Sequence, residues 1–164
     1  MKAAVWYDQE DIRIEEVTEP TAGPGEVKIK IKACGICGSD LHEYRDGPFI
    51  IPAKPHPLTG RSKGPVILGH EFSAEVVEPG DGVEKFSAGD RVTMNALIVC
   101  GQCHYCRQGA FNMCVKLGST GFAADGGFAE YFKAPACNLL PLPDSVPFDI
   151  GGLTSCAVIT AVHA

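Results

Sequence analysis

The sequence predicts a mainly β fold, an antiparallel barrel or sandwich made of short strands with few helices. Glycine (19) and proline (12) are spread along the 164 residues, which is typical of short strands joined by turns. The clearest strand, residues 26–33, alternates Val27, Ile29 and Ile31 with lysines, so that one face is buried and one is wet. Only three segments favour helices. A chain of 164 residues is long enough for one domain with a core of its own.

The predicted elements can be placed in chain order. Residues 2–7 and 12–17 form a first hairpin, a turn-rich connection at 20–25 follows, and then comes the strand at 26–33. Further strands are expected at 72–77, 91–95 and 127–134, and short helices at 39–44 and 104–108. Residues 45–65 form a long excursion rich in proline and glycine, and loops of this length are often functional.

The last segment, residues 148–164, is apolar and rich in small residues, and it predicts a buried helix. The pattern stops without a helix cap. We expect this helix either to lead towards a further domain or to pack on the barrel as a C-terminal helix.

Composition narrows the functional class. The formal net charge is −6 and no run of Lys or Arg stands out, which argues against nucleic-acid and anionic-membrane binding. Met1 is not followed by a long apolar region, and no stretch is long enough to span a bilayer, so we expect a cytoplasmic protein. Eight cysteines without an export signal fit a reducing compartment in which thiols bind metal.

The most informative pattern is C-x2-C-x2-C-x7-C, formed by Cys100, Cys103, Cys106 and Cys114. Four soft sulfur ligands at this spacing suit a tetrahedral, structural Zn²⁺, and nearby glycines allow tight turns around an ion. A disulfide framework would need an oxidising compartment, and an iron–sulfur cluster usually has a shorter last gap followed by Cys-Pro. A site closed by four thiolates leaves no position for a substrate.

A second constellation consists of Cys37, the pair His70-Glu71, and Cys156. Each is weak alone, because Gly-His-Glu is often a structural turn and a helical cysteine is often a small hydrophobe. Together two thiolates and one imidazole are three ligands that leave a fourth position open, which is the arrangement of a catalytic zinc.

These motifs carry a family resemblance. Cys-Gly-Ser-Asp-x-His at 37–42, Gly-His-Glu at 69–71, Gly-Asp-Arg-Val at 89–92 and the four-cysteine lobe at 100–114 occur in this order along the chain. The chain resembles the N-terminal catalytic domain of the zinc-dependent alcohol dehydrogenases of the medium-chain dehydrogenase/reductase superfamily. The resemblance covers residues 1–164 and implies a GroES-like antiparallel barrel with a projecting cysteine lobe, the helix at 148–164 leading towards a Rossmann domain.

The resemblance implies that Cys37, His70 and Cys156 hold the catalytic zinc. Cys156 is assigned by aligning Cys156-x3-Thr160 with the Cys-x3-Thr of the family. It also implies that Glu71 approaches the metal transiently or holds water.

The remaining site residues are assigned in the same way. Asp40 orients the ligand histidine, Ser39 and His42 form a proton relay to solvent, and Thr160 meets the nicotinamide ring. For two of them a plainer interpretation stays open: Asp40 could cap the short helix, and His42 could be a surface histidine.

The implied reaction is hydride transfer from a zinc-bound alkoxide to NAD(P), with two Zn²⁺ per chain. No G-x-G-x-x-G opens a helix after a strand, so the nucleotide-binding domain is absent and the chain alone should bind zinc without turning over. Residues 56–72 resemble the butanediol and sorbitol dehydrogenase branch, although Cys156 stands where that branch tends to carry glutamate. The expected partners are a small alcohol or vicinal diol, the Rossmann domain and another copy of the chain. The alternatives are a non-enzymatic zinc-binding module and, more remotely, a GroES-like co-chaperone.

Overall fold

The computed structural model describes residues 1–163, and within them the fold is mainly β. The main sheet has five strands in the order β10-β6-β5-β3-β9, and all of its pairings are antiparallel. A second sheet has the order β2-β1-β4, and β7 pairs with β8 in a third. The strands are β1 Lys2–Asp8, β2 Asp11–Glu16, β3 Glu26–Gly35, β4 Val66–Ile67, β5 Glu71–Pro79, β6 Arg91–Met94, β7 Leu97–Ile98, β8 Gly118–Ser119, β9 Tyr131–Pro135 and β10 Leu139–Pro141.

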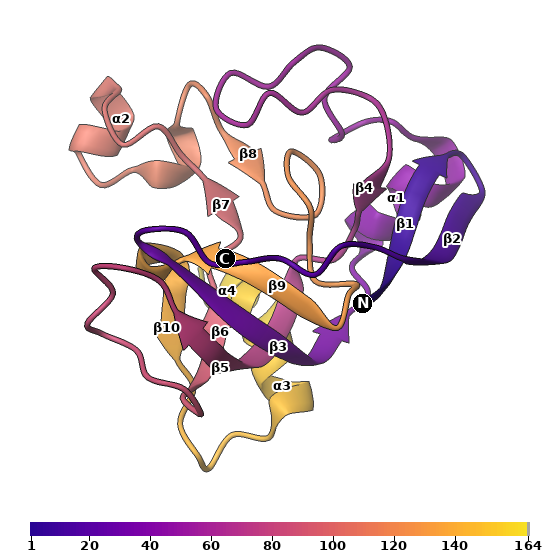
Figure 1. The fold of residues 1–164 in the computed structure, drawn as a ribbon. Helices are drawn as coiled ribbons and strands as arrows, with labels where there is room; N and C mark the ends of the chain where they lie inside the picture. Colours follow the sequence, from indigo (N-terminus) through magenta and orange to yellow (C-terminus); the bar gives the residue numbers. More distant parts are fainter. Residues whose placement is uncertain (164) are drawn as a thin grey trace.

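The helices are short. They are α1 Gly38–Asp46, α2 His104–Arg107, α3 Phe148–Leu153 and α4 Ile159–His163, with single 3₁₀ turns at Phe111–Met113 and Ala136–Asn138. Of these, α2 lies in a projecting lobe, and α3 packs against β3 and β5 of the main sheet (Figure 1). A π-helical turn, Thr154–Val158, joins α3 to α4. No helix among the described residues is long and apolar enough to cross a membrane.

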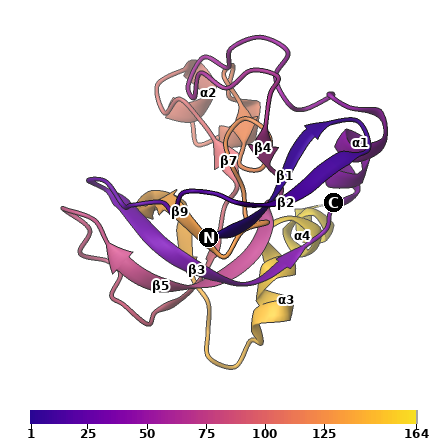
Figure 2. The same ribbon diagram turned by 45° about the vertical axis from the view of Figure 1, so that its right-hand side comes forward.

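The predicted antiparallel hairpin is confirmed, since β1 pairs with β2. The alternation in β3 is also confirmed, because Val27 and Ile29 are fully buried in the main core while Lys30 is exposed. Figure 2 shows α1 beside the β1–β2 hairpin, where the Glu10 amide donates to the Tyr44 carbonyl over 2.7 Å.

Strand β5 does not alternate, because both of its faces are covered. Residues 71–74 are all buried: one face packs in the core, and α3 lies against the other. This double cover is the reason why Ser73, which the sequence pattern would place in solvent, is fully buried.

Two expectations about the elements are wrong in part. The strand expected at 127–134 begins only at Tyr131, because the chain from Gly127 to Ala129 follows another course, bonding to the Leu68 and Gly69 carbonyls and to β1. The sequence does not predict the shortest strands, because two or three residues cannot display a periodic pattern. These strands are β4, β7, β8 and β10.

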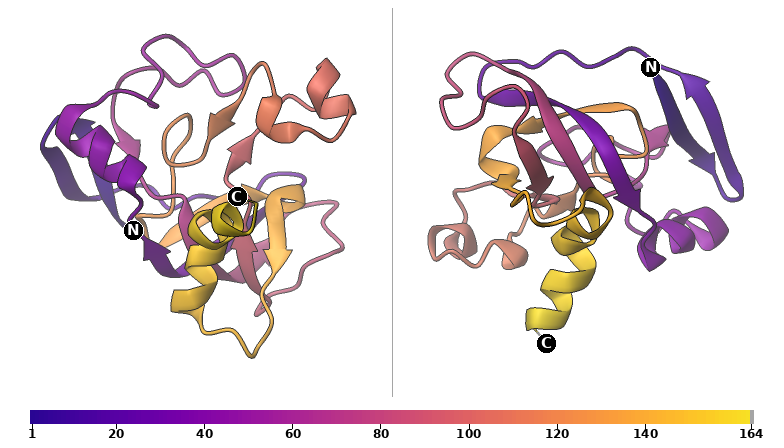
Figure 3. Two further views of the ribbon diagram at one scale, coloured as in Figure 1. Left: turned by 180° about the vertical axis from the view of Figure 1, so that it is seen from behind. Right: turned by 90° about the horizontal axis from the view of Figure 1, so that it is seen from below.

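The helix expected at 148–164 exists, but its second half is not buried. Val158 is 45% exposed and Val162 is 76% exposed. In the right-hand view of Figure 3 the helix runs away from the sheet and ends outside the other elements. Only its first turns pack, against β3 and β5. Ala164 lies outside the described residues.

The long excursion at 45–65 is irregular between α1 and β4, and its two ends are held differently. Near α1 the fully buried Glu43 carboxylate accepts the Phe49, Ile50 and Ile51 amides. Further on, Thr59 Oγ1 donates to the Ala123 carbonyl over 2.5 Å. The excursion is therefore a fixed part of the fold.

Candidate metal centres and active site

The four cysteines of the lobe converge. The sulfur atoms of Cys100, Cys103, Cys106 and Cys114 all lie within 4.8 Å of one another. Figure 1 shows the lobe, which carries α2, projecting from the main sheet at the end of β7 and β8. Gly101 and Gly109 have φ values of 68° and 77°, so the tight turns expected at these glycines are present.

The donor set fits a zinc ion. Four sulfurs bound at about 2.3 Å in a tetrahedron lie roughly 3.8 Å apart, and Cys100 Sγ and Cys114 Sγ are 3.6 Å apart. The Cys100 and Lys116 amides donate to Cys114 Sγ, which favours its thiolate form and lowers its pKa. Hydrogen bonds from the Cys106 and Val115 amides lower the pKa of Cys103 to about 6. The lobe is therefore ready to hold a cation.

The second cluster is brought together by strand register. Strand β3 ends at Gly35, which pairs with Glu71, the first residue of β5. Cys37 therefore follows the end of one strand while His70 precedes the start of its neighbour, at the same edge of the sheet. The Glu71 carboxylate has room here because residue 35 is glycine. A Cβ at this position would lie only 2.7 Å from Glu71 Oε2.

Cys156 reaches this edge from the C-terminal helix. It lies in the π-helical turn, a conformation that is often found at functional sites. Its sulfur and the ligand atoms of Cys37, His70 and Glu71 all lie within 4.8 Å of one another. The structure thus brings all four predicted residues together, although Cys37 and Cys156 are far apart in the sequence.

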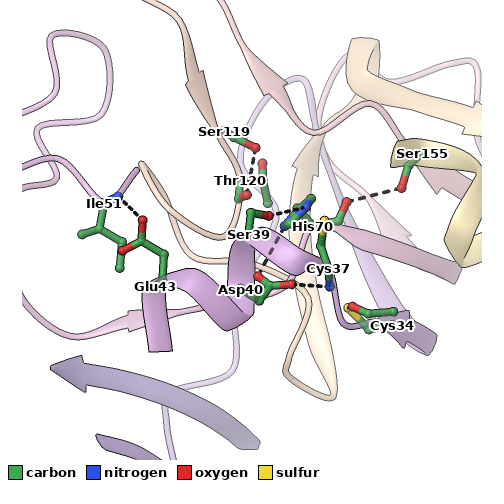
Figure 4. Close-up of polar contacts among 11 residues, drawn as sticks. Cys34, Cys37, Ser39, Asp40, Glu43, Ile51, His70, Ser119, Thr120 and Ser155 are labelled. Atoms are coloured by element: carbon green, nitrogen blue, oxygen red, sulfur yellow. Dashed lines mark hydrogen bonds and ion pairs between the residues drawn. The ribbon is translucent and has the colours of Figure 1, made fainter. Parts of the chain in front are cut away.

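Asp40 and His70 form the polar support of the second cluster (Figure 4). Asp40 Oδ1 lies 3.4 Å from His70 Nδ1, and both side chains are buried. The other carboxylate oxygen, Oδ2, accepts the Cys37 amide over 2.9 Å. Asp40 therefore caps α1 and faces the imidazole at once, so the two interpretations of this residue are compatible. Nδ1 faces Asp40, which leaves Nε2 for a metal.

The thiols of this cluster differ in acidity. Burial raises the pKa of Cys156 to about 12, with further increases from Glu71 and Cys37. Burial also acts on Cys37, but the hydroxyl and amide of Ser39, and then His70, outweigh it and lower the pKa of Cys37. The Glu71 carboxylate and the sulfurs of Cys37 and Cys156 lie within 4.8 Å of one another, so a cation bound among them would stabilise their negative charge. The residues present therefore fit a zinc ion.

Ser39 lies at the site, whereas His42 and Thr160 face solvent. Ser39 Oγ is 3.5 Å from His70 Nε2, on the side where a metal would bind. His42 is exposed on α1, and no hydrogen bond joins it to Ser39 within the described part of the chain. Thr160 is exposed one helical turn beyond Cys156.

Sequence reasoning missed two contacts of the histidine. The Phe122 ring lies 5.1 Å from the His70 ring, centroid to centroid, and is buried in the cluster that also holds Trp6 and Ile51. Ser155 Oγ donates to the His70 carbonyl over 3.3 Å (Figure 4). No local signal marks Phe122, whereas Ser155 adjoins Cys156 and could have been considered with it.

A cleft of about 1070 Å³ lies elsewhere, between the N-terminal hairpin and the base of the lobe. Among the four residues of the second cluster none lines it. The chemistry of the donor sets is therefore the better indicator of the active site than the size of the cavity.

Comparison with known proteins decides the family. Residues 23–144 match the family described as "Alcohol dehydrogenase GroES-like domain". The chain belongs to this family. The expected membership among the zinc-dependent alcohol dehydrogenases of the medium-chain superfamily is confirmed, and so is the GroES-like fold.

The relatives include polyol and diol dehydrogenases. The chain is 50% identical over 155 residues to (R,R)-butanediol dehydrogenase of Bacillus subtilis, covering 93% of this chain and 43% of that protein. It is 43% identical over 134 residues to sorbitol dehydrogenase of Halalkalibacterium halodurans, covering 81% and 36%. The chain therefore spans less than half the length of these relatives.

Solved structures agree with this family. The crystal structure of 2R,3R-butanediol dehydrogenase from Bacillus subtilis matches with a TM-score of 0.90 and 47% identity, over 99% of this chain and 47% of the other. A cobalt- and zinc-bound thermostable alcohol dehydrogenase from Pyrobaculum aerophilum matches with a TM-score of 0.82 and 30% identity, over 98% and 46%.

Proposed function

We propose that residues 1–164 are the catalytic domain of a zinc-dependent alcohol or diol dehydrogenase, which acts together with a Rossmann domain of the same enzyme. The observation that carries the proposal is the convergence of Cys37, His70, Glu71 and Cys156 at one edge of the sheet of a GroES-like domain. A structural module would need only the cysteine lobe. By itself the domain lacks the second wall of a cofactor cleft, so we expect it to be inactive alone.

The two clusters take different roles in this proposal. Cys37, His70 and Cys156 would hold a catalytic zinc, and the four lobe cysteines would hold a structural zinc, which would make two Zn²⁺ per chain. When bound, the catalytic zinc supplies Lewis acidity at the substrate hydroxyl. Glu71, at the same edge of the sheet, holds water or replaces it beside the metal.

Two residues of α1 would move the proton of the substrate hydroxyl. Ser39 Oγ, beside His70 Nε2, takes the proton of the substrate hydroxyl, and His42, exposed on the same helix, passes it to solvent. The Asp40 carboxylate holds the His70 ring in orientation meanwhile. Bound NAD(P) would supply the hydride acceptor, and Thr160 would border its nicotinamide.

The substrate class follows from the relatives. Butanediol and sorbitol dehydrogenases act on diols and polyols, as their names state. We therefore propose a secondary alcohol or a vicinal diol as substrate. All eight cysteines are free, which supports a reducing, cytoplasmic location for the enzyme.

The test is an assay of the protein that contains this chain together with its nucleotide-binding domain. 2,3-Butanediol, sorbitol and a simple secondary alcohol are offered with NAD⁺ or NADP⁺, and reduction of the cofactor is followed by absorbance. We expect turnover with at least one of the alcohols, and a reduction of roughly 10²–10⁴-fold in Ser39→Ala. The matched control is Ser145→Ala, because Ser145 is exposed outside both clusters.

A protein that binds two zinc ions and NAD(P) but oxidises no alcohol would contradict the enzyme proposal. That result would favour the non-enzymatic zinc-binding module. Full turnover in Ser39→Ala would remove only the proton relay from the proposal.

A further inference from the structure

The starting point is the way in which Cys156 is held. Cys37 and His70 are fixed by the pairing of β3 with β5, whereas Cys156 is carried by a helix whose second half is exposed. The position of its sulfur therefore depends on how the first turns of that helix are attached to the rest of the fold.

One arginine gathers the segment that leads into the helix. Arg91 is the first residue of β6 and belongs to the Gly-Asp-Arg-Val motif. Its guanidinium donates to three main-chain carbonyls, those of Pro143 (3.2 Å), Asp144 (2.7 Å) and Val146 (2.6 Å). A planar group with several donors can collect acceptors that point inward from a tight turn.

The same guanidinium reaches the helix itself. Its central carbon lies 4.3 Å from the centre of the Phe148 ring, and Phe148 is the first residue of α3. The ion pair with Asp144, at 3.6 Å, adds little, because the Asp144 side chain is 98% exposed. The main chain of Arg91 also accepts the Leu142 amide. Backbone and side chain of Arg91 thus hold both ends of residues 142–148.

Two buried hydroxyls continue this attachment along the helix. Ser73 in β5 and Thr93 in the neighbouring strand β6 are directly paired in the sheet. Ser73 Oγ donates to the Phe148 carbonyl over 2.5 Å, and Thr93 Oγ1 lies 3.3 Å from the Gly151 carbonyl. Both hydroxyls are on strands of the main sheet, and His70 immediately precedes one of these strands, β5. The helix is therefore attached to the strands that place the other ligands.

We propose that Arg91 is a positioning residue for the second metal centre: by fixing the entry to α3, it places Cys156 against Cys37 and His70. This inference rests on the proposed function, because it assumes that the second cluster binds zinc. Arg91 itself is outside that cluster, since its guanidinium contacts residues 143–148.

The test compares zinc content in Arg91→Met, which removes the donors but keeps an unbranched side chain, with the unaltered protein, each including its nucleotide-binding domain. After purification without added metal, elemental analysis should show that Arg91→Met holds one zinc ion fewer per chain at the two centres of this domain, one in place of two. Arg91→Lys, with one donor group in place of a fork, should lie between them. The control is Arg13→Met, because Arg13 is an exposed arginine that contacts Asp11 and the Tyr7 ring, outside both clusters, and it should keep two.

A second readout separates positioning from a general loss of stability. Each protein is treated with iodoacetamide, and the labelled cysteines are located by peptide mapping. In Arg91→Met, Cys156 and Cys37 should gain label at least tenfold faster, while the four lobe cysteines stay protected. Exposed Cys137 should be labelled equally in all proteins and serves as the internal standard.

If Arg91→Met does not fold, Arg91→Lys provides the test, because a single ammonium group cannot bind the three carbonyls as the guanidinium does. It should weaken binding of the second zinc alone. Two zinc ions in Arg91→Met would overturn the positioning role and leave the proposed function standing. Equal loss of both zinc ions from folded Arg91→Met, or no loss from Arg91→Lys when Arg91→Met cannot fold, would also overturn it. One zinc in the unaltered chain would overturn both proposals.

Discussion

The two cysteine-containing clusters of this chain are built in opposite ways. The lobe takes its four sulfurs from fifteen consecutive residues, in a projecting segment with only a short helix and a 3₁₀ turn. The second cluster takes its groups from the end of β3, the start of β5 and the C-terminal helix. The first needs only local turns, whereas the second needs strand register and an attached helix. The same thiol chemistry thus depends on the fold to very different extents.

The largest effect is expected in the lobe. Replacing the buried Cys106 by serine should lower the zinc content from two to one and unfold the lobe, because metal binding is most of its folding free energy, roughly 10–16 kcal/mol in zinc-finger peptides. Limited proteolysis should then cut between residues 99 and 117. Cys137→Ser is the control and should behave like the unaltered chain. Survival of both zinc ions would show that the lobe does not depend on all four thiolates.

A comparable loss of metal with little loss of structure is expected at the second cluster. Cys156→Ser should also lower the zinc content from two to one, but the lobe should resist proteolysis, because the sheets and the lobe do not need this sulfur. Thermal unfolding should shift by only a few degrees. If Cys156→Ser loses both zinc ions, the two centres are coupled and the contrast between them is wrong.

A smaller effect is expected from the support of the histidine. Asp40→Asn keeps an acceptor for the Cys37 amide but removes the negative charge beside His70. Zinc affinity of the second centre should fall about 10–100-fold, as is typical when the group that orients a ligand histidine is altered. Competition with a chromophoric chelator measures this affinity. The lobe should hold its zinc unchanged, and an equal weakening at both centres would contradict the assignment.

The smallest effect is a pH dependence of the metal-free chain. Burial alone would lower the pKa of His70, but the Asp40 carboxylate 3.4 Å away, followed by Cys37, raises that pKa above its ordinary value of 6.5. A raised pKa in the folded state means that the pair stabilises the fold below pH 6.5, and that this stabilisation is lost as the pH rises through the pKa of folded His70. Urea unfolding of the chelator-treated chain at several pH values should show it. The stability difference between the unaltered chain and Asp40→Asn should shrink as the pH rises through this window, and a difference that grows would contradict the assignment.

Sequence reasoning succeeded where the determining signal is local. The cysteine spacing defined the lobe, and the alternation in β3 defined its buried face. It failed where a neighbour decides. Ser73 is buried because α3 covers β5, and Val158 is exposed because the helix leaves the sheet, and neither fact can be read from the residues around them.

For the second cluster, the residue types came from motifs and from family resemblance, while their meeting came from the fold. The motifs supplied Cys37, His70 and Glu71, but not the Phe122 ring against the imidazole. They also supplied Arg91 as part of Gly-Asp-Arg-Val, without a role for its side chain. The roles of Ser39, His42 and Thr160 stay predictions.

What the sequence by itself determined is the chemistry that is available: four closely spaced thiols, a cysteine and histidine set for a second ion, and a mainly β chain without a run of basic residues. Local spacing and alternation are sufficient for the lobe and the strand pattern, because neighbouring residues meet whatever the rest of the chain does. The second set came from motifs and family resemblance. The tertiary structure alone decided that Cys156 reaches Cys37 and His70. That meeting depends on the pairing of β3 with β5. It also depends on Arg91, Ser73 and Thr93, whose side chains contact the carbonyls of Val146, Phe148 and Gly151 although they are distant from them in the sequence.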